Sequence, residues 1–225
     1  MLAARTSRRK TAFALNVAHQ VALRSGDAVV VFSQEMNKQE INDRLICLAG
    51  GVSFADLHDH RETERVRNAF HAAAALPIYI RDAAATVPAI HAKVRRLATQ
   101  RKVALVVIDY LQLLTPAGRF ENRRQEVSAM SRGLKLVAQE LGIPFLVLSQ
   151  LKRFDGTREP NLSDLRESGS IEQDANTLMF LHSDREFVDM DANTPAPMRL
   201  ILAKHRSGPV GRVEVLFERR TGRFT

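Results

Sequence analysis

The stretch AARTSRRKT, at residues 3–11, ends in a lysine and a threonine, as do the loops that bind nucleotide phosphates. In the pattern G-x-x-x-x-G-K-[ST], backbone N–H groups surround the phosphates, the lysine contacts their outer oxygens, and the hydroxyl binds Mg²⁺. Ala4 and Arg9 replace the two glycines here. A glycine at the second place lets the backbone approach phosphate without a Cβ. Lys10 and Thr11 predict a nucleotide site, and a solvated basic tail is the alternative.

Three apolar runs lead into polar side chains that suit phosphate and metal chemistry. Asp109 ends one run, where a carboxylate can hold a Mg²⁺-bound water. Glu35 follows a second run, where it could polarise an attacking water as a general base, and Gln150 ends a third, where it could hydrogen-bond a terminal phosphate. Each residue alone is equally compatible with a strand end that caps exposed backbone. Together with Lys10 and Thr11, they favour nucleotide hydrolysis.

Lys204 and Arg206 occupy alternate positions of the stretch AKHRSGPVG, at residues 203–211. Side chains two residues apart on a strand face the same side. Two cations on one side can neutralise the charge of a transferred phosphoryl group, including one bound by a neighbouring subunit. A solvated strand edge that carries a lysine against aggregation is the alternative.

The segment SDLRESGSIEQDA, at residues 163–175, places Arg166 among serine and glycine residues in a loop that opens a helix. Backbone N–H groups and a guanidinium in such a place can hold a phosphate of a nucleic-acid backbone. Glu167, Glu172 and Asp174 weaken a purely electrostatic interpretation. An ordinary polar loop is therefore the alternative.

The elements that must position these residues alternate between helix and strand. Continuous apolar and β-branched runs predict strands at 28–33, 77–82, 103–109 and 143–150. Helical spacing of apolar residues predicts helices at 12–26, 36–50, 61–76, 86–100 and 123–142. This alternation indicates an α/β fold whose mostly parallel sheet carries helices on both faces.

The ends of the chain add two expectations to this sheet. Only MLAA precedes the phosphate-loop stretch, so we expect the chain to begin inside its first strand. The segments 176–183, 198–208 and 211–225 read as consecutive strands that extend one side of the sheet in antiparallel fashion. The irregular stretches 115–123 and 151–170 follow the carboxyl ends of buried strands, where open α/β sheets bind their ligands.

Composition sets the broad class of the protein. At 225 residues and 45% hydrophobic content, the chain is long and apolar enough for one large globular domain. Its 33 Lys and Arg against 25 Asp and Glu give a net charge of +8, which favours a polyanionic partner. A single cysteine, Cys47, excludes an intramolecular disulfide, and no apolar run approaches the roughly 20 residues that span a bilayer. We therefore expect a cytoplasmic location and no membrane partner.

The motifs FSQEM, VVIDYLQLL, LSQLKR, SDLRESGSIEQDA and KHRSGPVG, in this order, resemble the C-terminal motor domain of the DnaB-type replicative helicases, over residues 3–224. The resemblance implies a RecA-like P-loop NTPase fold in a single domain over residues 1–225. It implies Mg²⁺ and ATP as cofactor and substrate, hydrolysis at the subunit interfaces of a homo-hexameric ring, and translocation along single-stranded DNA. A helicase loader or a primase is a further partner that it implies.

Carried over residue by residue, the resemblance assigns roles to single positions. It assigns nucleotide binding to Arg5, Ser7, Arg9, Lys10, Thr11 and Asp109, and Mg²⁺ to Thr11 and Asp109. It assigns catalysis to Glu35, which matches the catalytic glutamate, and to Gln150, which matches the glutamine that links nucleotide state to DNA. It also assigns catalysis to Lys204 and Arg206, with Arg206 as the arginine finger. DNA binding falls to Arg166, Glu167 and Gly169.

The sequence also departs from the family pattern. The family loop usually reads A-R-P-S-M-G-K-T, whereas Thr6, Arg8 and Arg9 stand here for proline, methionine and glycine. We expect Arg9 to weaken nucleotide binding, and we expect the family's N-terminal domain and linker helix to be absent. A non-hydrolysing paralogue or truncated fragment that binds DNA or a helicase is therefore an alternative function. A RecA-type recombination ATPase is a third, which DLRESGSIEQDA does not favour.

Overall fold

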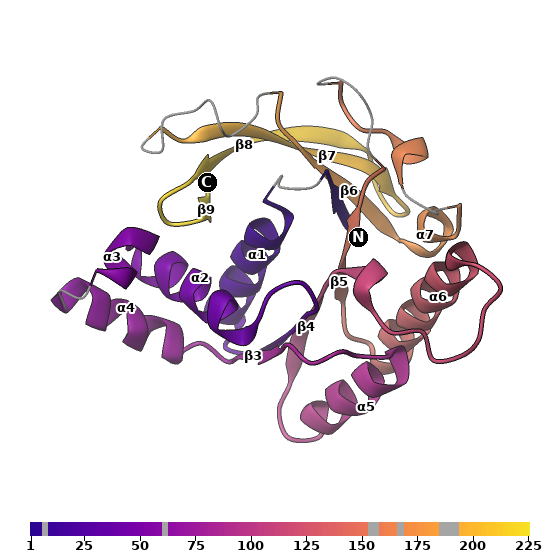
Figure 1. Ribbon diagram of the computed structural model, residues 1–225, viewed down its shortest axis with the longest axis horizontal. Coiled ribbons are helices and arrows are strands. Elements are labelled where there is room, and N and C mark those ends of the chain that lie inside the picture. Colours follow the sequence, from indigo (N-terminus) through magenta and orange to yellow (C-terminus); the bar gives the residue numbers. More distant parts are fainter. Residues whose placement is uncertain (6–8, 60–62, 153–157, 166–168, 185–193) are drawn as a thin grey trace.

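The computed structural model describes residues 1–5, 9–59, 63–152, 158–165, 169–184 and 194–225. Within these ranges, nine strands form one sheet in the order β3-β2-β4-β5-β1-β6-β7-β8-β9 (Figure 1). The elements in chain order are β1 (Leu2–Ala4), α1 (Lys10–Ser25), β2 (Ala28–Ser33), α2 (Lys38–Gly50), α3 (Phe54–His58), α4 (Glu64–Ala74), β3 (Ile78–Arg81), α5 (Val87–Ala98), β4 (Val103–Asp109), the 3-10 helix η1 (Leu111–Leu113), α6 (Arg123–Leu141), β5 (Phe145–Gln150), the 3-10 helix η2 (Leu162–Asp164), α7 (Gly169–Asp174), β6 (Thr177–His182), β7 (Ala196–His205), β8 (Gly211–Glu218) and β9 (Arg223–Phe224).

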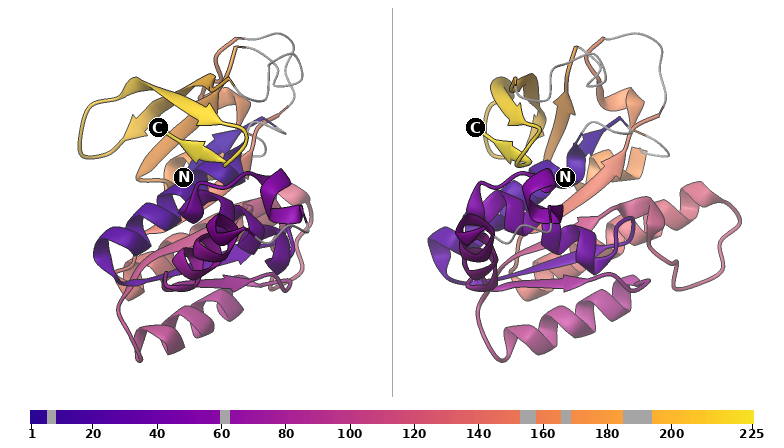
Figure 2. Two further views of the ribbon diagram at one scale, coloured as in Figure 1. Left: turned by 90° about the vertical axis from the view of Figure 1, so that its left-hand side faces the viewer. Right: turned by 60° about the vertical axis from the view of Figure 1, so that its left-hand side comes forward.

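The strands from β3 to β6 run parallel to one another, and β7, β8 and β9 continue the sheet in antiparallel fashion. Figure 2 shows this antiparallel part curving over α1. There the ring of Phe224 on β9 meets that of Phe13 on α1 at 5.1 Å, edge to face. The predicted mostly parallel sheet and its antiparallel extension are both confirmed.

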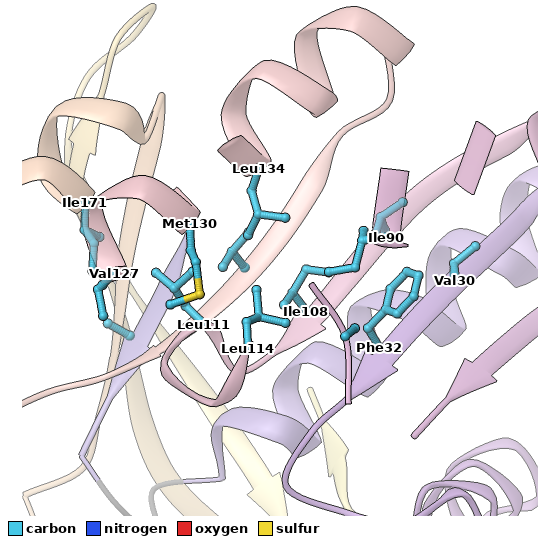
Figure 3. Close-up of a cluster of buried hydrophobic side chains, with 14 of the residues drawn as sticks. Val30, Phe32, Ile90, Ile108, Leu111, Leu114, Val127, Met130, Leu134 and Ile171 are labelled. Carbon is cyan, nitrogen blue, oxygen red and sulfur yellow. The ribbon is translucent and has the colours of Figure 1, made fainter. Parts of the chain in front are cut away.

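Two apolar cores cover the two faces of the sheet, because successive side chains of a strand point to opposite sides. Val29 and Val31 of β2 pack in a cluster with the buried residues of α1 and α2. Val30 and Phe32 pack in the other cluster, with Ile90 of α5 and the buried residues of α6 (Figure 3). The continuous apolar run at 28–33 is thus explained by burial on both faces.

β1 is the short strand that precedes the phosphate-loop stretch. It lies in the centre of the sheet, where Leu2 pairs with Leu148 of β5 and with Met179 of β6. Its three residues are fully buried. The expectation that MLAA forms part of a first strand is confirmed.

The helices differ from the predicted ones mainly between β2 and β3. The structure contains α3, which the apolar spacing does not predict, and α4 begins at Glu64 after an N-cap at Thr63. α3 is only five residues long and starts at a capping box formed by Ser53 and Asp56. So short a helix shows too little periodicity to be recognised, and its stability comes from the cap and from tertiary packing.

Candidate functional site

The phosphate-loop stretch connects β1 to the first turn of α1. The part that the structure describes begins with Ala4 at the end of β1 and resumes at Arg9, the N-cap of α1. Lys10 and Thr11 are the first two residues of α1, so their backbone lies at the positively polarised end of that helix. Ser7 lies outside the described residues. A strand end and a helix N-terminus therefore flank this stretch, as they flank a phosphate-binding loop.

Arg9 adopts a left-handed backbone conformation, which glycine adopts without strain. Its φ of 59° and ψ of 26° place it in the left-handed region, where an L-residue with a side chain carries strain of about 1 kcal/mol. Its guanidinium lies over the ring of Phe217 on β8, 5.6 Å from the ring centroid. Burial lowers the pKa of Arg9, and the nearby cations Arg44 and Arg219 lower it further. The larger residue therefore keeps the turn while its side chain extends to the antiparallel part of the sheet.

Thr11 and Asp109 are in direct contact, although 98 positions separate them in the sequence. The Thr11 hydroxyl donates a hydrogen bond of 2.6 Å to Oδ2 of Asp109. Asp109 is only 1% exposed, and its Oδ1 has no hydrogen-bond partner among the residues that the structure describes. Burial raises the pKa of this carboxyl group, which the Thr11 hydrogen bond and the charge of Lys10 counteract. A hydroxyl beside a carboxylate with an unused oxygen fits Mg²⁺, a cation that prefers oxygen ligands.

Lys10 completes this group. Its ammonium lies 4.2 Å from the centroid of the Tyr110 ring, next to Asp109 in the chain. Burial lowers the pKa of Lys10, whereas the carboxylates of Asp109 and Glu35 raise it. The ammonium therefore lies over an aromatic face, and two carboxylates favour its charged form.

The predicted strand-end residues share one edge of the sheet. Ser33 pairs with Asp109 and Ala4 pairs with Gln150, so the carboxyl ends of β2, β4, β1 and β5 lie side by side. Glu35 lies two residues beyond β2, where its side chain is exposed. The structure thus brings Glu35 and Gln150 to the same edge as the Thr11 and Asp109 pair. Arg5, directly after β1, begins the loop at this edge and is half-buried.

Gln112 joins two of these strand ends and was not among the predicted site residues. Its Nε2 donates a hydrogen bond of 2.9 Å to Oγ of Ser149, and its Oε1 accepts one of 3.4 Å from the backbone of Gln150. It lies in η1, immediately after β4. The motif IDYLQLL contained this residue, but an amide in an apolar run carries no signal for a contact with the next strand.

Lys204 and Arg206 lie at the opposite edge of the sheet. Lys204 pairs with Leu178 at the start of β6, and β7 runs antiparallel to β6, so the end of β7 lies at the amino edge of the parallel strands. Lys204 and Arg206 each donate to a backbone carbonyl of α7, that of Glu172 and that of Gln173 respectively. The prediction that both side chains face the same side is confirmed. They lie away from Thr11 and Asp109 of the same chain.

The predicted DNA-binding residues fall around the start of α7. Gly169 is the first residue of α7 and is exposed. Arg166 and Glu167 lie outside the described residues. Among the described residues, no group of three or more His, Cys, Asp and Glu side chains is placed to bind a metal ion. No helix in the described part of the chain has the length and apolar character needed to span a membrane.

Comparison with known proteins gives one consistent result. A family model described as DnaB-like helicase C terminal domain matches residues 1–225. The chain is 41% identical over 233 residues to the replicative DNA helicase DnaB of Geobacillus stearothermophilus, and 40% identical over 233 residues to the replicative DNA helicase DnaC of Bacillus subtilis. Each alignment covers 100% of this chain and 51% of the relative. The chain therefore spans about half the length of these curated relatives.

Two solved structures resemble the fold along almost the whole chain. One is described as an ATPase domain, and the other as a DnaB-like replicative helicase and its interactions with primase. Each has a TM-score of 0.90 and 37% identity and covers 99% of this chain. The match covers 82% of the first structure and 57% of the second. The predicted RecA-like α/β class is confirmed.

Proposed function

Since the chain belongs to the DnaB-like helicase C-terminal domain family, we propose that it is the motor of a replicative DNA helicase, which hydrolyses Mg-ATP to translocate along single-stranded DNA. The observation that carries this proposal is the contact between Thr11 and Asp109, with Lys10 beside it at the N-terminus of α1. A phosphate-binding lysine, a hydroxyl and a buried carboxylate at the end of the neighbouring apolar strand form the minimal set for Mg-nucleotide binding.

The residues at the carboxyl edge divide the chemistry between them. Lys10 contacts the outer phosphate oxygens, and Thr11 and Asp109 hold Mg²⁺. When bound, Mg²⁺ supplies positive charge that stabilises the transferring phosphoryl group. Glu35 is exposed beyond the carboxyl end of β2, and it accepts the proton of the attacking water as general base. Gln150 hydrogen-bonds the terminal phosphate and transmits its presence to the loop that follows β5.

Catalysis requires a second copy of the chain. Lys204 and Arg206 lie at the amino edge of the sheet, so they cannot reach the nucleotide of their own chain without unfolding β7. In a ring, the amino edge of one copy faces the nucleotide of the next, and Arg206 acts there as the arginine finger. The family's homo-hexameric ring is the assembly that this separation of groups supports.

DNA and protein partners complete the proposal. Single-stranded DNA binds through its phosphate backbone to the segment that contains Arg166, Glu167 and Gly169, the last of which is the first residue of α7. The net charge of +8 supports a polyanionic partner. A helicase loader and a primase are further partners, and one of the similar solved structures is described with its interactions with primase. We place this single RecA-like domain, residues 1–225, in the cytoplasm.

The non-hydrolysing alternative is not favoured. It depends on Arg9, whose backbone retains the glycine-like left-handed conformation and whose guanidinium lies over Phe217. The relatives that match the whole chain are replicative helicases.

The experiment that tests the proposal is ATP hydrolysis with and without single-stranded DNA, at chain concentrations high enough for self-association. Thr11→Val removes the hydroxyl at the start of α1, and Ser25→Ala removes one at its end as a matched control. We expect DNA-stimulated hydrolysis that survives Ser25→Ala and falls at least about 100-fold in Thr11→Val. Absence of hydrolysis from the unsubstituted chain while it is associated would contradict the proposal.

A further inference from the structure

The carboxyl end of α7 gathers cations from several elements. Three consecutive backbone carbonyls, at 172–174, each accept a hydrogen bond from a different basic side chain. Lys204 donates to the first, Arg206 to the second at 2.7 Å, and Lys135 to the third at 2.7 Å. The last carbonyls of a helix lack partners within the helix and carry partial negative charge, so cations are stabilised there.

Lys135 is the member of this set that no motif indicated. It lies on α6, whereas Lys204 lies on β7 and Arg206 follows β7. Lys135 also donates to Oδ1 of Asn176 at 3.0 Å, and the backbone N–H of Arg206 donates to the carbonyl of the same Asn176 at 3.0 Å. Lys135 and Arg206 are therefore anchored on the same short segment.

The side chain of Asp174 adds a second link between α6 and α7. Its Oδ2 accepts a hydrogen bond of 2.8 Å from Ser131, and its Oδ1 lies 3.5 Å from the guanidinium of Arg132. A cavity of about 530 Å³ lies alongside, lined by Lys135, Asp174 and Asn176 together with apolar residues of α6 and β5. The buried Ile171 packs α7 in an apolar cluster with α6, and the polar contacts of Lys135 and Asp174 fix the carboxyl end of α7 beside this cavity.

The charges of this cluster favour an anion from outside. Burial lowers the pKa of Lys135, and the cations Arg206, Arg132 and Lys204 lower it further, against the opposing charge of Asp174. Lys135 and the three cations that act on it therefore lie near one carboxylate among the described residues, that of Asp174. A phosphate oxygen is a stronger acceptor for a guanidinium than a neutral carbonyl, so a phosphate from a neighbouring copy would take the Arg206 guanidinium from its α7 carbonyl. The backbone N–H of Arg206 would stay bonded to Asn176, which Lys135 also holds.

We propose that Lys135 is a positioning residue that fixes the carboxyl end of α7, and through it aims Lys204 and Arg206 at the nucleotide of the neighbouring copy. The inference rests on the proposed function, because it concerns how the motor presents its arginine finger. Lys135 acts through α7 and does not contact the nucleotide.

The test compares Lys135→Met with Lys135→Arg in DNA-stimulated ATP hydrolysis by the full chain. We expect Lys135→Met to lower kcat about tenfold and to change the KM for ATP less than about twofold, because an interaction used only in the transition state is lost. Lys135→Arg keeps a cationic donor and should restore most of the activity. In an Arg206→Ala background, Lys135→Met should cause little further loss, since both changes remove the same contribution.

Two controls separate positioning from general loss of stability and from failure of the proposed function. Lys93→Met removes an exposed lysine of α5 and should leave kcat unchanged. Hydrogen exchange of the backbone amides at 172–176 should quicken in Lys135→Met and not in Lys135→Arg. Unchanged kcat in Lys135→Met, or an equal loss with and without Arg206, would overturn the inference while the proposed function stands. Absence of hydrolysis in both the unsubstituted chain and Lys93→Met would overturn the proposed function, and the inference with it.

Discussion

At the carboxyl edge of the sheet, Thr11 and Asp109 contact each other inside the protein, and Lys10 is held against the Tyr110 ring beside them. At the amino edge, Lys204 and Arg206 lie at the surface or only partly covered, and they are bound to backbone carbonyls of α7. One group of polar residues is assembled within the chain. The other lies at the opposite edge, away from Thr11 and Asp109, and we propose that a neighbouring copy uses it.

This contrast supports the proposal that the motor works as an assembly. A buried carboxylate with one unused oxygen is costly until a cation reaches it, so the carboxyl edge is organised to receive one. The cations at the amino edge already have weak neutral acceptors, which a phosphate can replace. Under the proposed function, nucleotide binding is therefore a property of one copy, and rapid hydrolysis is a property of two.

The largest effect should come from Arg206→Ala. We expect DNA-stimulated turnover to fall about 1,000-fold, as for removal of an arginine finger, because charge on the transferring phosphoryl group is no longer neutralised. Binding of ATP should be unchanged, because Arg206 lies at the edge opposite to Lys10. The measurements are kcat and equilibrium binding of ATP. A large loss of ATP binding by the dissociated Arg206→Ala chain would contradict the claim that only the carboxyl edge binds the nucleotide.

Lys10→Met should have the next largest effect and should act on the other edge. Turnover should fall about 100-fold, and ATP binding should weaken with it, since the ammonium contacts phosphate in the ground state as well as in the transition state. Equilibrium binding of ATP, with Lys93→Met as the control, measures this effect. Intact ATP binding in Lys10→Met would remove Lys10 from the nucleotide site.

Asp109→Asn should raise the stability of the protein, whereas most substitutions at buried positions lower it. Burial raises the pKa of Asp109, so its contribution to stability is present below its unfolded pKa and is lost as pH rises through the folded pKa. The substitution should therefore raise the free energy of unfolding by about 1 kcal/mol at pH 7, and by less in acid, while hydrolysis is lost.

The matched variant on the other edge is Asp174→Asn, which should lower stability because the Asp174 carboxylate is paired with Ser131 and Arg132. Urea unfolding at pH 7 and at pH 5 measures both variants. If Asp109→Asn destabilised the protein as much as Asp174→Asn, the account of Asp109 as a buried carboxylate with one unpaired oxygen would be wrong.

The smallest effect should come from Arg9→Gly. Glycine adopts a positive φ without strain, but the side chain of Arg9 already lies over Phe217, so ATP binding should tighten by only about threefold. Titration of both proteins with ATP measures the difference. ATP hydrolysis that appeared only after Arg9→Gly would instead show that the arginine prevents hydrolysis.

The parts of the fold that follow from local patterns could be predicted from the sequence. The apolar β-branched runs at 28–33 and 103–109 are strands buried on both faces. Gly26, at which the helical pattern stops, is the C-cap of α1 and has a φ of 69°. α3 could not be predicted, because the five-residue helix depends on its capping box and on a contact of its first residue with the carbonyl of Arg220.

The candidate site likewise contains residues that local patterns predict and residues that they do not. Lys10 and Thr11 belong to a contiguous pattern, and Asp109 is recognisable as a carboxylate that ends an apolar run. The contacts of Gln112 with β5 and of Lys135 with α7 join segments that are distant in sequence. No local spacing carries a signal for such contacts, since only the folded sheet brings the segments together.

A mixing experiment tests most directly the claim that the two edges act between copies. Lys10→Met lacks a working carboxyl edge, and Arg206→Ala lacks a working amino edge, so each variant alone should hydrolyse ATP poorly. Mixed chains that associate should recover DNA-stimulated hydrolysis well above either variant, because some interfaces then pair an intact Lys10 with an intact Arg206. A mixture that co-assembles by size-exclusion chromatography yet stays no more active than the separate variants would contradict the account.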